Sequence, residues 1–444
     1  MERNPARVVV LSFAGAIAAG TLLLLIPAAT APGRHTDVLT ALFTATSAVC
    51  VTGLTVVDTS KHWTPLGQAI ILLLIQVGGL GIMTMSTLLF FLLGRRITLR
   101  ERLLIQEALG QESLAGLVRL VRAILVATVT IEAAGALVLA ARWSFDYPWR
   151  KALWYGVFHA VSAFNNAGFD IFGPSMMGYV GDPVVNLVIP GLIITGGIGF
   201  TVIMDLVYSR RLGRPLTLHT RLVLLTTAAL IAAGFVVVLL AEWSNPRTLG
   251  GLPLGARLWA AFFQAVVPRT AGFFSVDIGA LRPFTLLFMV VLMFIGASPN
   301  STGGGIKTTT FSVVALTVWA TIAGREDVTF AGRRLHWSVV NRAIAIAVIA
   351  FTLVVAVTGA LLFIQGAPFL NLLFETTSAF GTVGLSAGVG TGSLTPTLNS
   401  WARLLIIGMM FIGRVGPLTA AVAIARRQRR RPLYRLPVDR VMVG

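Results

Sequence analysis

The sequence of 444 residues has a single cysteine, Cys50, and only 12% charged residues. One cysteine excludes an intrachain disulfide, and we interpret Cys50 as a small buried residue. Soluble domains carry charge at about a quarter of their positions. Because 56% of this chain is hydrophobic, a soluble globule would expose too much apolar surface. The shortage of charge therefore predicts a membrane protein.

Acidic residues are scarcer still, with 17 against 35 basic ones and a net charge of +18. Such an excess is compatible with nucleic-acid binding, but the positions of Lys and Arg argue against it. With the N-terminus inside, 23 of the 35 basic residues fall in cytoplasmic segments, which is the positive-inside asymmetry of membrane proteins. We therefore predict both termini in the cytoplasm of a multi-pass plasma-membrane protein, contact with anionic lipid, and no nucleic-acid partner.

Histidine is also rare, and the five histidines are scattered along the chain. A membrane enzyme would need a converging acid/base or metal cluster at one membrane face. Glu132 and Glu375 are single carboxylates within apolar stretches, for which helix packing or backbone bonding is the favoured role. The sequence thus predicts neither an enzyme nor a covalently bound cofactor.

Long apolar runs are abundant, and eight of them are about long enough to cross a bilayer. The first resembles a signal-peptide core but lacks a convincing cleavage site, so we interpret it as a retained span. The predicted spans are Val8–Ala28, Leu66–Leu93, Ala123–Ala141, Pro183–Tyr208, Leu222–Ala241, Phe284–Ile322 (interrupted), Ala343–Ile364 and Trp401–Ala425.

The eight spans form four consecutive pairs, and a related segment lies between the two spans of each pair. Each of these four segments ends in a glycine that lies ten residues after a phenylalanine. The final triplets are Val51-Thr52-Gly53, Asn166-Ala167-Gly168, Thr270-Ala271-Gly272 and Thr382-Val383-Gly384. The spacing predicts an all-α integral membrane fold of four parallel M1-P-M2 repeats, with eight spans and four re-entrant pore helices around one central pore. The predicted repeats are 1–94, 95–210, 211–324 with an intramembrane loop at 298–310, and 325–425, followed by a basic cytoplasmic tail at 426–444.

The triplets are the candidate ion-binding residues. Irregular backbone at membrane depth survives only against protein or water, and strands like these point carbonyls at an ion in potassium filters. Glycine closes each triplet because such a strand needs φ values that a Cβ disfavours. Asp58, Asp170 and Asp277 follow three of the triplets, and they are equally compatible with a cation-attracting vestibule and with ordinary capping.

The sixth span is interrupted by Ser298–Thr310, which contains a proline, three consecutive glycines and a lysine. A continuous helix is not expected there. The spacing does not match a phosphate-binding P-loop, because Ile306 separates Gly305 from Lys307. We predict a gate formed by Gly303, Gly304, Gly305 and Lys307, with Arg414 of the eighth span donating hydrogen bonds to it.

These motifs resemble the Trk/Ktr/HKT superfamily of cation transporters along the whole chain. The resemblance is carried by Thr44–Leu54, Phe164–Phe169, Arg269–Phe273, Ser301–Phe311 and Gly381–Leu385. Within the superfamily the chain is most similar to KtrB-type potassium-translocating subunits. Departures are Val267-Pro268 before the third triplet and Ala297 and Asn300 in the loop, where the family more often has Ser-Thr and glycines.

The resemblance implies potassium uptake through the glycine ring, a homodimer, and gating by a cytosolic ring of KtrA-like nucleotide-binding subunits. Sodium-preferring relatives carry serine at the first filter glycine, whereas this chain has Gly53, which favours potassium. A sodium or weakly selective cation channel or transporter of the same fold is the alternative. Possible sodium dependence, and the choice between a channel and a symporter, stay open.

Overall fold

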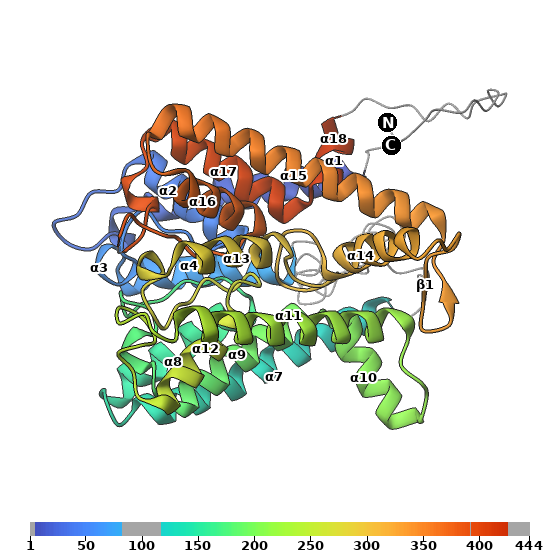
Figure 1. Cartoon of the computed structure of the whole chain (residues 1–444). Coiled ribbons are helices and arrows are strands. Elements are labelled where there is room, and N and C mark those ends of the chain that lie inside the picture. The colour runs from blue at the N-terminus through green and yellow to red at the C-terminus, as the bar shows by residue number, and fades with distance from the viewer. Residues whose placement is uncertain (1–4, 82–116, 391, 425–444) are drawn as a thin grey trace.

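The computed structural model of the chain describes residues 5–81, 117–390 and 392–424, and these are mostly helical (Figure 1). Among the described residues, four helices are long and apolar enough to cross a membrane, and the bent pair α9–α10 makes five if it counts as one span. The four long helices are α1 (Pro5–Leu24), α7 (Leu117–Trp143), α11 (Leu218–Glu242) and α15 (Trp337–Gln365).

A short helix follows each long one and packs against it. These short helices are α2 (Val38–Val49), α8 (Trp149–Phe164), α12 (Leu254–Val266) and α16 (Phe369–Gly381). At 12 to 16 residues they fall short of the roughly 20 that a span requires. Each ends one to four residues before the first residue of one of the four glycine-ended triplets.

A second apolar helix follows every triplet. The structure places α4 (Pro65–Leu80), α9 (Pro183–Gly197), α13 (Pro283–Phe294) and α17 (Ser400–Val415) in this position. Polar side chains begin several of them: Asp182 caps α9, Asn399 caps α17 and Thr64 caps α4 by accepting hydrogen bonds from first-turn amides.

Three of these helices, α9, α13 and α17, are followed by a break and a further helix, whereas α4 ends at Gly81, where the described residues stop. The sequence led us to expect only the break after α13. Gly81, Gly199 and Gly416 have φ of 80°, 94° and 94° and ψ of 139°, 140° and 134°, a conformation that is essentially restricted to glycine. The continuing helices are α10 (Phe200–Leu212), α14 (Thr308–Ile322) and α18 (Pro417–Ile424). The expected span Pro183–Tyr208 is instead two helices bent by 95°.

The predicted second span, Leu66–Leu93, is described only as far as Gly81, and the tail at 426–444 lies outside the described residues. The described part of the chain also contains several small elements. They are α3 (Thr59–His62), the 3₁₀ turns Pro27–Ala29, Met177–Tyr179, Ile278–Ala280 and Thr395–Thr397, and strands β1 (Thr329–Phe330) and β2 (Arg333–Arg334). The two strands pair antiparallel between α14 and α15, a hairpin that the all-helical expectation omitted.

Each triplet belongs to a group of one long helix, the short helix before the triplet and the second apolar helix after it. Contacts between the four groups form a closed ring. Each short helix contacts the second apolar helix of the preceding group, in the pairs α4–α8, α9–α12, α13–α16 and α17–α2. The last pair joins the C-terminal part of the chain to the N-terminal part, and both lie together in Figure 1. The short helices and their triplets are thereby gathered around a common centre.

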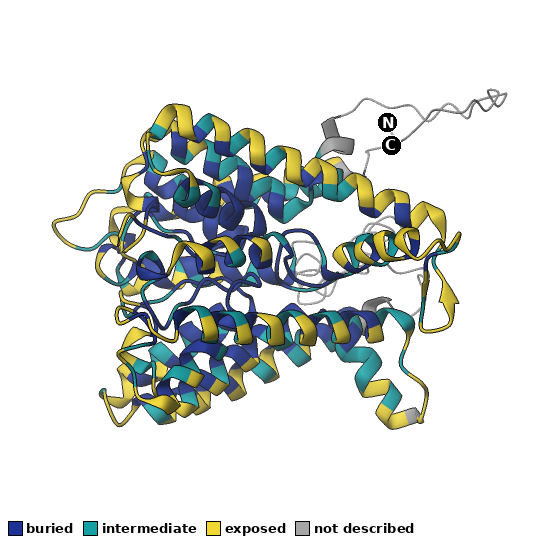
Figure 2. Ribbon diagram, viewed as in Figure 1, coloured by how far each residue is buried: buried dark blue, intermediate teal, exposed yellow. Residues whose placement is uncertain are grey.

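The outward faces of the long helices are exposed and apolar, whereas buried residues concentrate between the helices (Figure 2). On α15, Phe351 and Phe363 are 63% and 93% exposed, and on α11 Leu240 is 72% exposed. Apolar surface on this scale is unfavourable in water. The outer faces therefore match the hydrocarbon interior of a bilayer.

Glycines let the second apolar helices approach the ends of the short helices. A β-carbon on Gly78, Gly196 or Gly413 would collide with the carbonyl oxygen of Val49, Phe164 or Phe380, respectively. All three glycines lie three residues before the glycine break of their helix. The absence of a side chain at these three glycines therefore allows the ends of α2, α8 and α16 to contact the second apolar helices directly.

Gly413→Ala should lower the free energy of unfolding by about 1–3 kcal/mol, the usual cost of overpacking a dense site. Gly408 lies on the same helix, and nothing lies within 4 Å of the position of its β-carbon. Gly408→Ala should therefore be neutral or stabilising, since alanine favours a helix over glycine. Thermal unfolding of the detergent-solubilised variants checks this, and equal midpoints for both would contradict it.

Candidate functional site

The four triplets come together at their glycines. A β-carbon on Gly53 would lie 3.0 Å from the Gly168 Cα, and one on Gly384 would lie 3.0 Å from the Gly53 Cα. A β-carbon on Gly168 would lie 2.7 Å from the Gly272 Cα, and one on Gly272 would lie 3.3 Å from the Gly384 Cα. The glycines therefore form a closed ring in the order 53, 168, 272, 384.

The carbonyl oxygen of the middle residue of each triplet occupies the space that a β-carbon on the glycine of the neighbouring triplet would need. The Ala271 carbonyl oxygen lies 2.8 Å from the β-carbon position of Gly168, and the Val383 carbonyl oxygen lies 2.7 Å from that of Gly272. The Thr52 and Ala167 carbonyl oxygens occupy the same place in the other two contacts. A backbone carbonyl oxygen thus lies between each pair of neighbouring strands in the ring.

Two residues of every triplet are left-handed. The first residue has a φ between 50° and 71° and the glycine a φ between 68° and 94°, at Val51, Asn166, Thr270 and Thr382 and at Gly53, Gly168, Gly272 and Gly384. Non-glycine residues rarely adopt such φ values, and the β-branched ones least of all.

The amides of the triplets face the short helices behind them. The middle amides of three triplets, Thr52, Ala167 and Val383, each donate to a serine carbonyl of the preceding helix at 2.8 Å. The Gly53 and Gly384 amides donate to the Ser47 and Ser378 hydroxyls at 3.0 and 3.1 Å. Val266 occupies the equivalent position before Gly272, so the third triplet lacks this hydroxyl.

The sequence identified the glycine ends of the triplets but not their first residues as strained positions. Three of these first residues are polar and one, Val51, is apolar. Asn166 and Thr270 bond to each other through their side chains at 3.0 Å. When the four segments are aligned, no residue type is shared by all four first positions, so no local sequence pattern indicates the left-handed backbone.

The loop between α13 and α14 lies against these first residues. The Gly304 amide donates to the Thr382 hydroxyl at 3.0 Å. A β-carbon on Gly303 would come within 3.0 Å of the Thr270 Cβ, and one on Gly304 within 2.8 Å of the Thr382 Cγ2. The predicted gate glycines are therefore in contact with the third and fourth triplets.

The elbow between α9 and α10 holds the other side of the loop through the backbone. The Ser298 amide donates to the Gly197 carbonyl at 3.0 Å, and the Phe200 amide donates to the Asn300 carbonyl at 2.9 Å. Thr302 donates its amide to the Gly196 carbonyl at 3.2 Å and its hydroxyl to the Phe164 carbonyl at 3.1 Å. These bonds satisfy backbone groups that lipid leaves unpaired.

Arg414 joins the loop to a second helix break. Its guanidinium donates to the Thr302 carbonyl of the loop, to the Gly78 carbonyl of α4, and to the Gly79 carbonyl at 3.3 Å. Lys307 donates to the Gly303 carbonyl within the loop at 2.7 Å. Both predicted gate cations therefore bind loop carbonyls.

The three aspartates that follow triplets have defined backbone contacts. Asp58 accepts from the Ser60 amide at 2.9 Å, Asp170 from the Gly173 amide at 2.8 Å and Asp277 from the Gly279 amide at 3.0 Å. Each caps a turn or a short helix. The capping alternative accounts for all three, and attraction of cations stays a prediction.

The carboxylates within apolar stretches are bonded to neutral donors. Glu132 accepts from Asn165 at 2.8 Å and from Gln76 at 3.3 Å. Glu375 accepts from the Ser386 and Thr395 hydroxyls at 2.6 and 2.5 Å. These bonds join α7 to α4 and to the end of α8, and they join α16 to the irregular segment that follows its triplet, so the two carboxylates connect packed elements.

Glu242 belongs with them, although sequence reasoning did not single it out. It accepts from Asn245 at 2.6 Å, from the Thr248 hydroxyl at 2.7 Å, from the Arg282 amide at 2.9 Å and from the Thr285 hydroxyl. Its place at the end of the apolar α11, with hydroxyl and amide side chains following closely, was the available signal. The cluster fastens the end of α11 to the start of α13.

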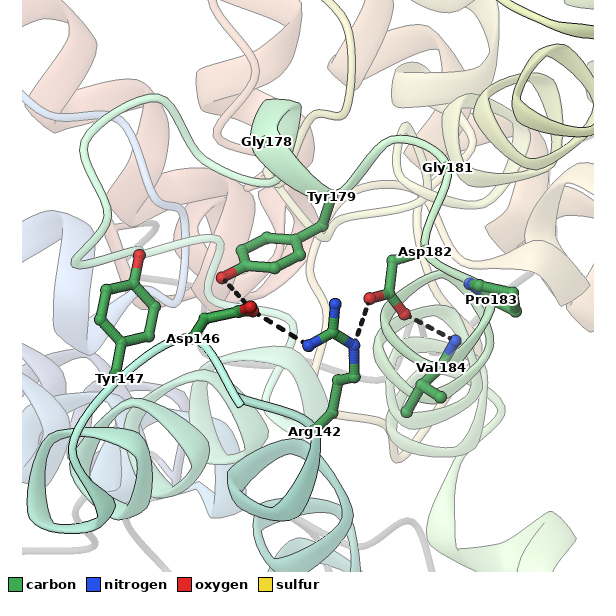
Figure 3. Close-up of a pocket in the computed structure, with 9 residues that line it drawn as sticks. All are labelled: Arg142, Asp146, Tyr147, Gly178, Tyr179, Gly181, Asp182, Pro183 and Val184. Carbon is green, nitrogen blue, oxygen red and sulfur yellow. Dashed lines mark hydrogen bonds and ion pairs between the residues drawn. The ribbon is translucent and has the colours of Figure 1, made fainter. Parts of the chain in front are cut away.

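A surface pocket lies apart from the triplets, with none of their residues in its lining (Figure 3). Arg142 lies between two carboxylates there, 3.0 Å from Asp146 and 2.6 Å from Asp182, and the Tyr179 hydroxyl donates to Asp146. The group braces the end of α7 against the start of α9. Within the described part of the chain, His, Cys, Asp and Glu form no group of three suited to a metal ion.

The chain is similar to known cation transport proteins. A family profile for the TrkH cation transport proteins matches residues 7–430. The chain is 44% identical to the Ktr system potassium uptake protein B of Bacillus subtilis, with 99% of this chain and 97% of that protein covered. It is 36% identical to the potassium/sodium uptake protein NtpJ of Enterococcus hirae, with coverage of 99% and 97%.

The fold also has a solved counterpart. The crystal structure of the potassium transporter TrkH from Vibrio parahaemolyticus superposes with a TM-score of 0.76 at 20% identity, covering 96% of this chain and 86% of that one. At that identity the likeness concerns the fold. With a family profile that spans nearly the whole chain and a relative 44% identical over its length, this multi-pass membrane protein belongs to the TrkH family of cation transport proteins.

Proposed function

We propose that the chain is the pore-forming subunit of a Ktr-type potassium uptake system. The observation that carries this proposal is the closed ring of Gly53, Gly168, Gly272 and Gly384, with a backbone carbonyl oxygen lying between each pair of neighbouring strands. A ring of carbonyls replaces part of a cation's hydration shell. The relatives named for potassium uptake support potassium as the transported ion.

The proposal gives the chain four M1-P-M2 repeats around one pore, bounded at 1–94, 95–210, 211–324 and 325–425. In each repeat the long helix is M1, the short helix is P and the broken helix is M2. The twelve triplet residues act as the selectivity filter. Both termini then lie in the cytoplasm, and the loop at 298–310 lies on the cytoplasmic side of the filter.

Potassium flux tests the function. The purified chain in liposomes should carry potassium down its gradient, and excess sodium should compete weakly. The alternative of a sodium or weakly selective pore is kept because one relative is named for potassium and sodium together. Equal competition by sodium would favour that alternative, and no cation flux in correctly folded protein would refute both.

Gly53→Ser should narrow the preference for potassium over sodium several-fold. The new β-carbon would press on the Ala167 carbonyl oxygen and the Gly168 Cα, and so distort a neighbouring strand of the ring. Competition flux measures the effect. Gly33→Ser is the matched control, because Gly33 also has a positive φ, of 77°, but no atom lies within 4 Å of its β-carbon position. Unchanged selectivity in Gly53→Ser would remove Gly53 from the filter.

The loop at 298–310, with Gly303, Gly304, Gly305, Lys307 and Arg414, is proposed as the gate. Its glycines contact the inner residues of two filter strands, so an ion leaving the filter meets the loop. Arg414 connects the loop to the broken helix of repeat 1 through carbonyl oxygens. Opening then requires that these bonds break or move together.

Arg414→Ala should raise basal potassium flux by about one to two powers of ten, with little change in ion preference. A hydrogen bond to a charged group contributes about 1.5–3 kcal/mol, and 1.4 kcal/mol is tenfold in an equilibrium. Arg403→Ala is the control, since Arg403 lies on the same helix and binds the Leu398 and Pro396 carbonyls instead. Deletion of Gly303–Gly305 should act like Arg414→Ala, and no change in either folded variant would make the loop a structural break.

The partners are proposed from the family. The subunit would form a homodimer and bind a cytosolic KtrA-like nucleotide-binding ring, with the basic tail at 426–444 as one contact. Deleting Leu436–Gly444 should weaken dimerisation or ring binding and leave ion preference unchanged. Size-exclusion chromatography and co-purification with the regulatory subunit measure this, and unaltered assembly would assign the tail to lipid contact.

A further inference from the structure

Thr382 is the point where the loop bonds directly to a triplet side chain. Its hydroxyl accepts from the Gly304 amide at 3.0 Å, and both residues are buried. Its own amide and that of Val383 donate to carbonyls of α16, those of Ala379 and Ser378. The backbone of the strand is therefore tied to its short helix, and the side chain alone reaches the loop.

The other three triplets present different groups at this position. Val51 has no hydroxyl, and Asn166 and Thr270 bond to each other at 3.0 Å. The contact with the loop amide is thus particular to the fourth strand among the four first residues. With Thr382 at a φ of 50°, its side chain is held on the loop side of the ring.

The hydroxyl has two competing uses. A threonine oxygen accepts through two lone pairs, and beside a ring of carbonyls it is a suitable ligand for a dehydrated potassium ion. An N–H group carries partial positive charge, so it repels a cation that approaches the same oxygen. The Arg414 guanidinium, bound to the Thr302 carbonyl of the same loop, adds a full positive charge to that side.

We propose that a potassium ion at the inner end of the filter and the Gly304 amide compete for the Thr382 hydroxyl, so that ion occupancy and loop closure oppose each other. The inference rests on the proposed function, because it needs an ion in the ring. By linkage the effect is reciprocal: the closed loop weakens the inner ion site, and potassium weakens closure to the same degree. Thr382 then acts as a positioning residue for the loop as well as an ion ligand.

The test follows loop exposure directly. Ser301→Cys places a thiol on the loop at a half-buried position, and its rate of modification by a charged thiol reagent is measured in detergent. Potassium is varied against N-methylglucamine at constant ionic strength. The chain without this substitution supplies the background from Cys50, which is fully buried. We expect potassium to speed modification by about two- to tenfold, the range that one hydrogen bond sets on an equilibrium.

Three further variants are compared in the Ser301→Cys background. Thr382→Val removes the hydroxyl, so modification should be fast without potassium and independent of it. Thr382→Ser keeps the hydroxyl and should keep the potassium dependence. Thr376→Val is the matched control, because it removes a buried hydroxyl of α16. This hydroxyl donates to the Leu372 carbonyl within the same helix, so the potassium dependence of the variant should match that of the parent.

Two results would overturn the inference. One is modification independent of potassium in the chain that retains Thr382, a result that needs no substitution at that position. The other is potassium dependence that persists in Thr382→Val. Potassium flux of the same preparations in liposomes distinguishes failure of this inference from failure of the proposed function. Flux together with potassium-independent modification rejects this inference alone. Absence of flux in every variant rejects the proposed function as well.

Discussion

Four backbone strands meet around one centre with no room for a β-carbon between them. The carbonyl of each middle residue occupies the space beside the next glycine, so a side chain at any of the four glycines would separate two strands. The same closeness requires that strand amides find partners behind the ring, which the short helices provide. The first residues of the strands have left-handed φ values, and the surrounding bonds stabilise that strain.

The ring brings the ends of the short helices together. For three of them, a glycine of a second apolar helix allows the close approach. Gly78, Gly196 and Gly413 lie directly against the terminal carbonyls of α2, α8 and α16. Three residues later each helix breaks at a second glycine, where the backbone leaves the helical path. In the third group the break is enlarged into a loop, and that loop crosses to the inner ends of two strands.

The loop has irregular backbone, and its polar groups are bonded to protein partners, as the backbone of a membrane-embedded loop requires. The elbow at Gly199 supplies backbone partners on one side, and Arg414 supplies donors on the other. Each group of elements therefore contributes to the loop: the first through the Gly78 carbonyl, the second through the elbow, the third through the loop itself, and the fourth through Thr382 and Arg414. A change in any one of these contacts alters the stability of the loop.

The sequence alone determined the membrane environment, the four glycine-ended triplets and the interrupted sixth span, because composition, spacing and runs of Gly and Pro act locally. It also indicated Lys307 and Arg414, since a cation within an apolar helix needs carbonyl partners wherever they lie. Only the tertiary structure decided that Val51, Asn166, Thr270 and Thr382 are left-handed, that α9 and α10 bend by 95°, and that Thr382 bonds to Gly304. These features depend on contacts between residues far apart in the chain, such as Gly304 and Thr382, which are 78 positions apart, and local propensity does not encode such contacts.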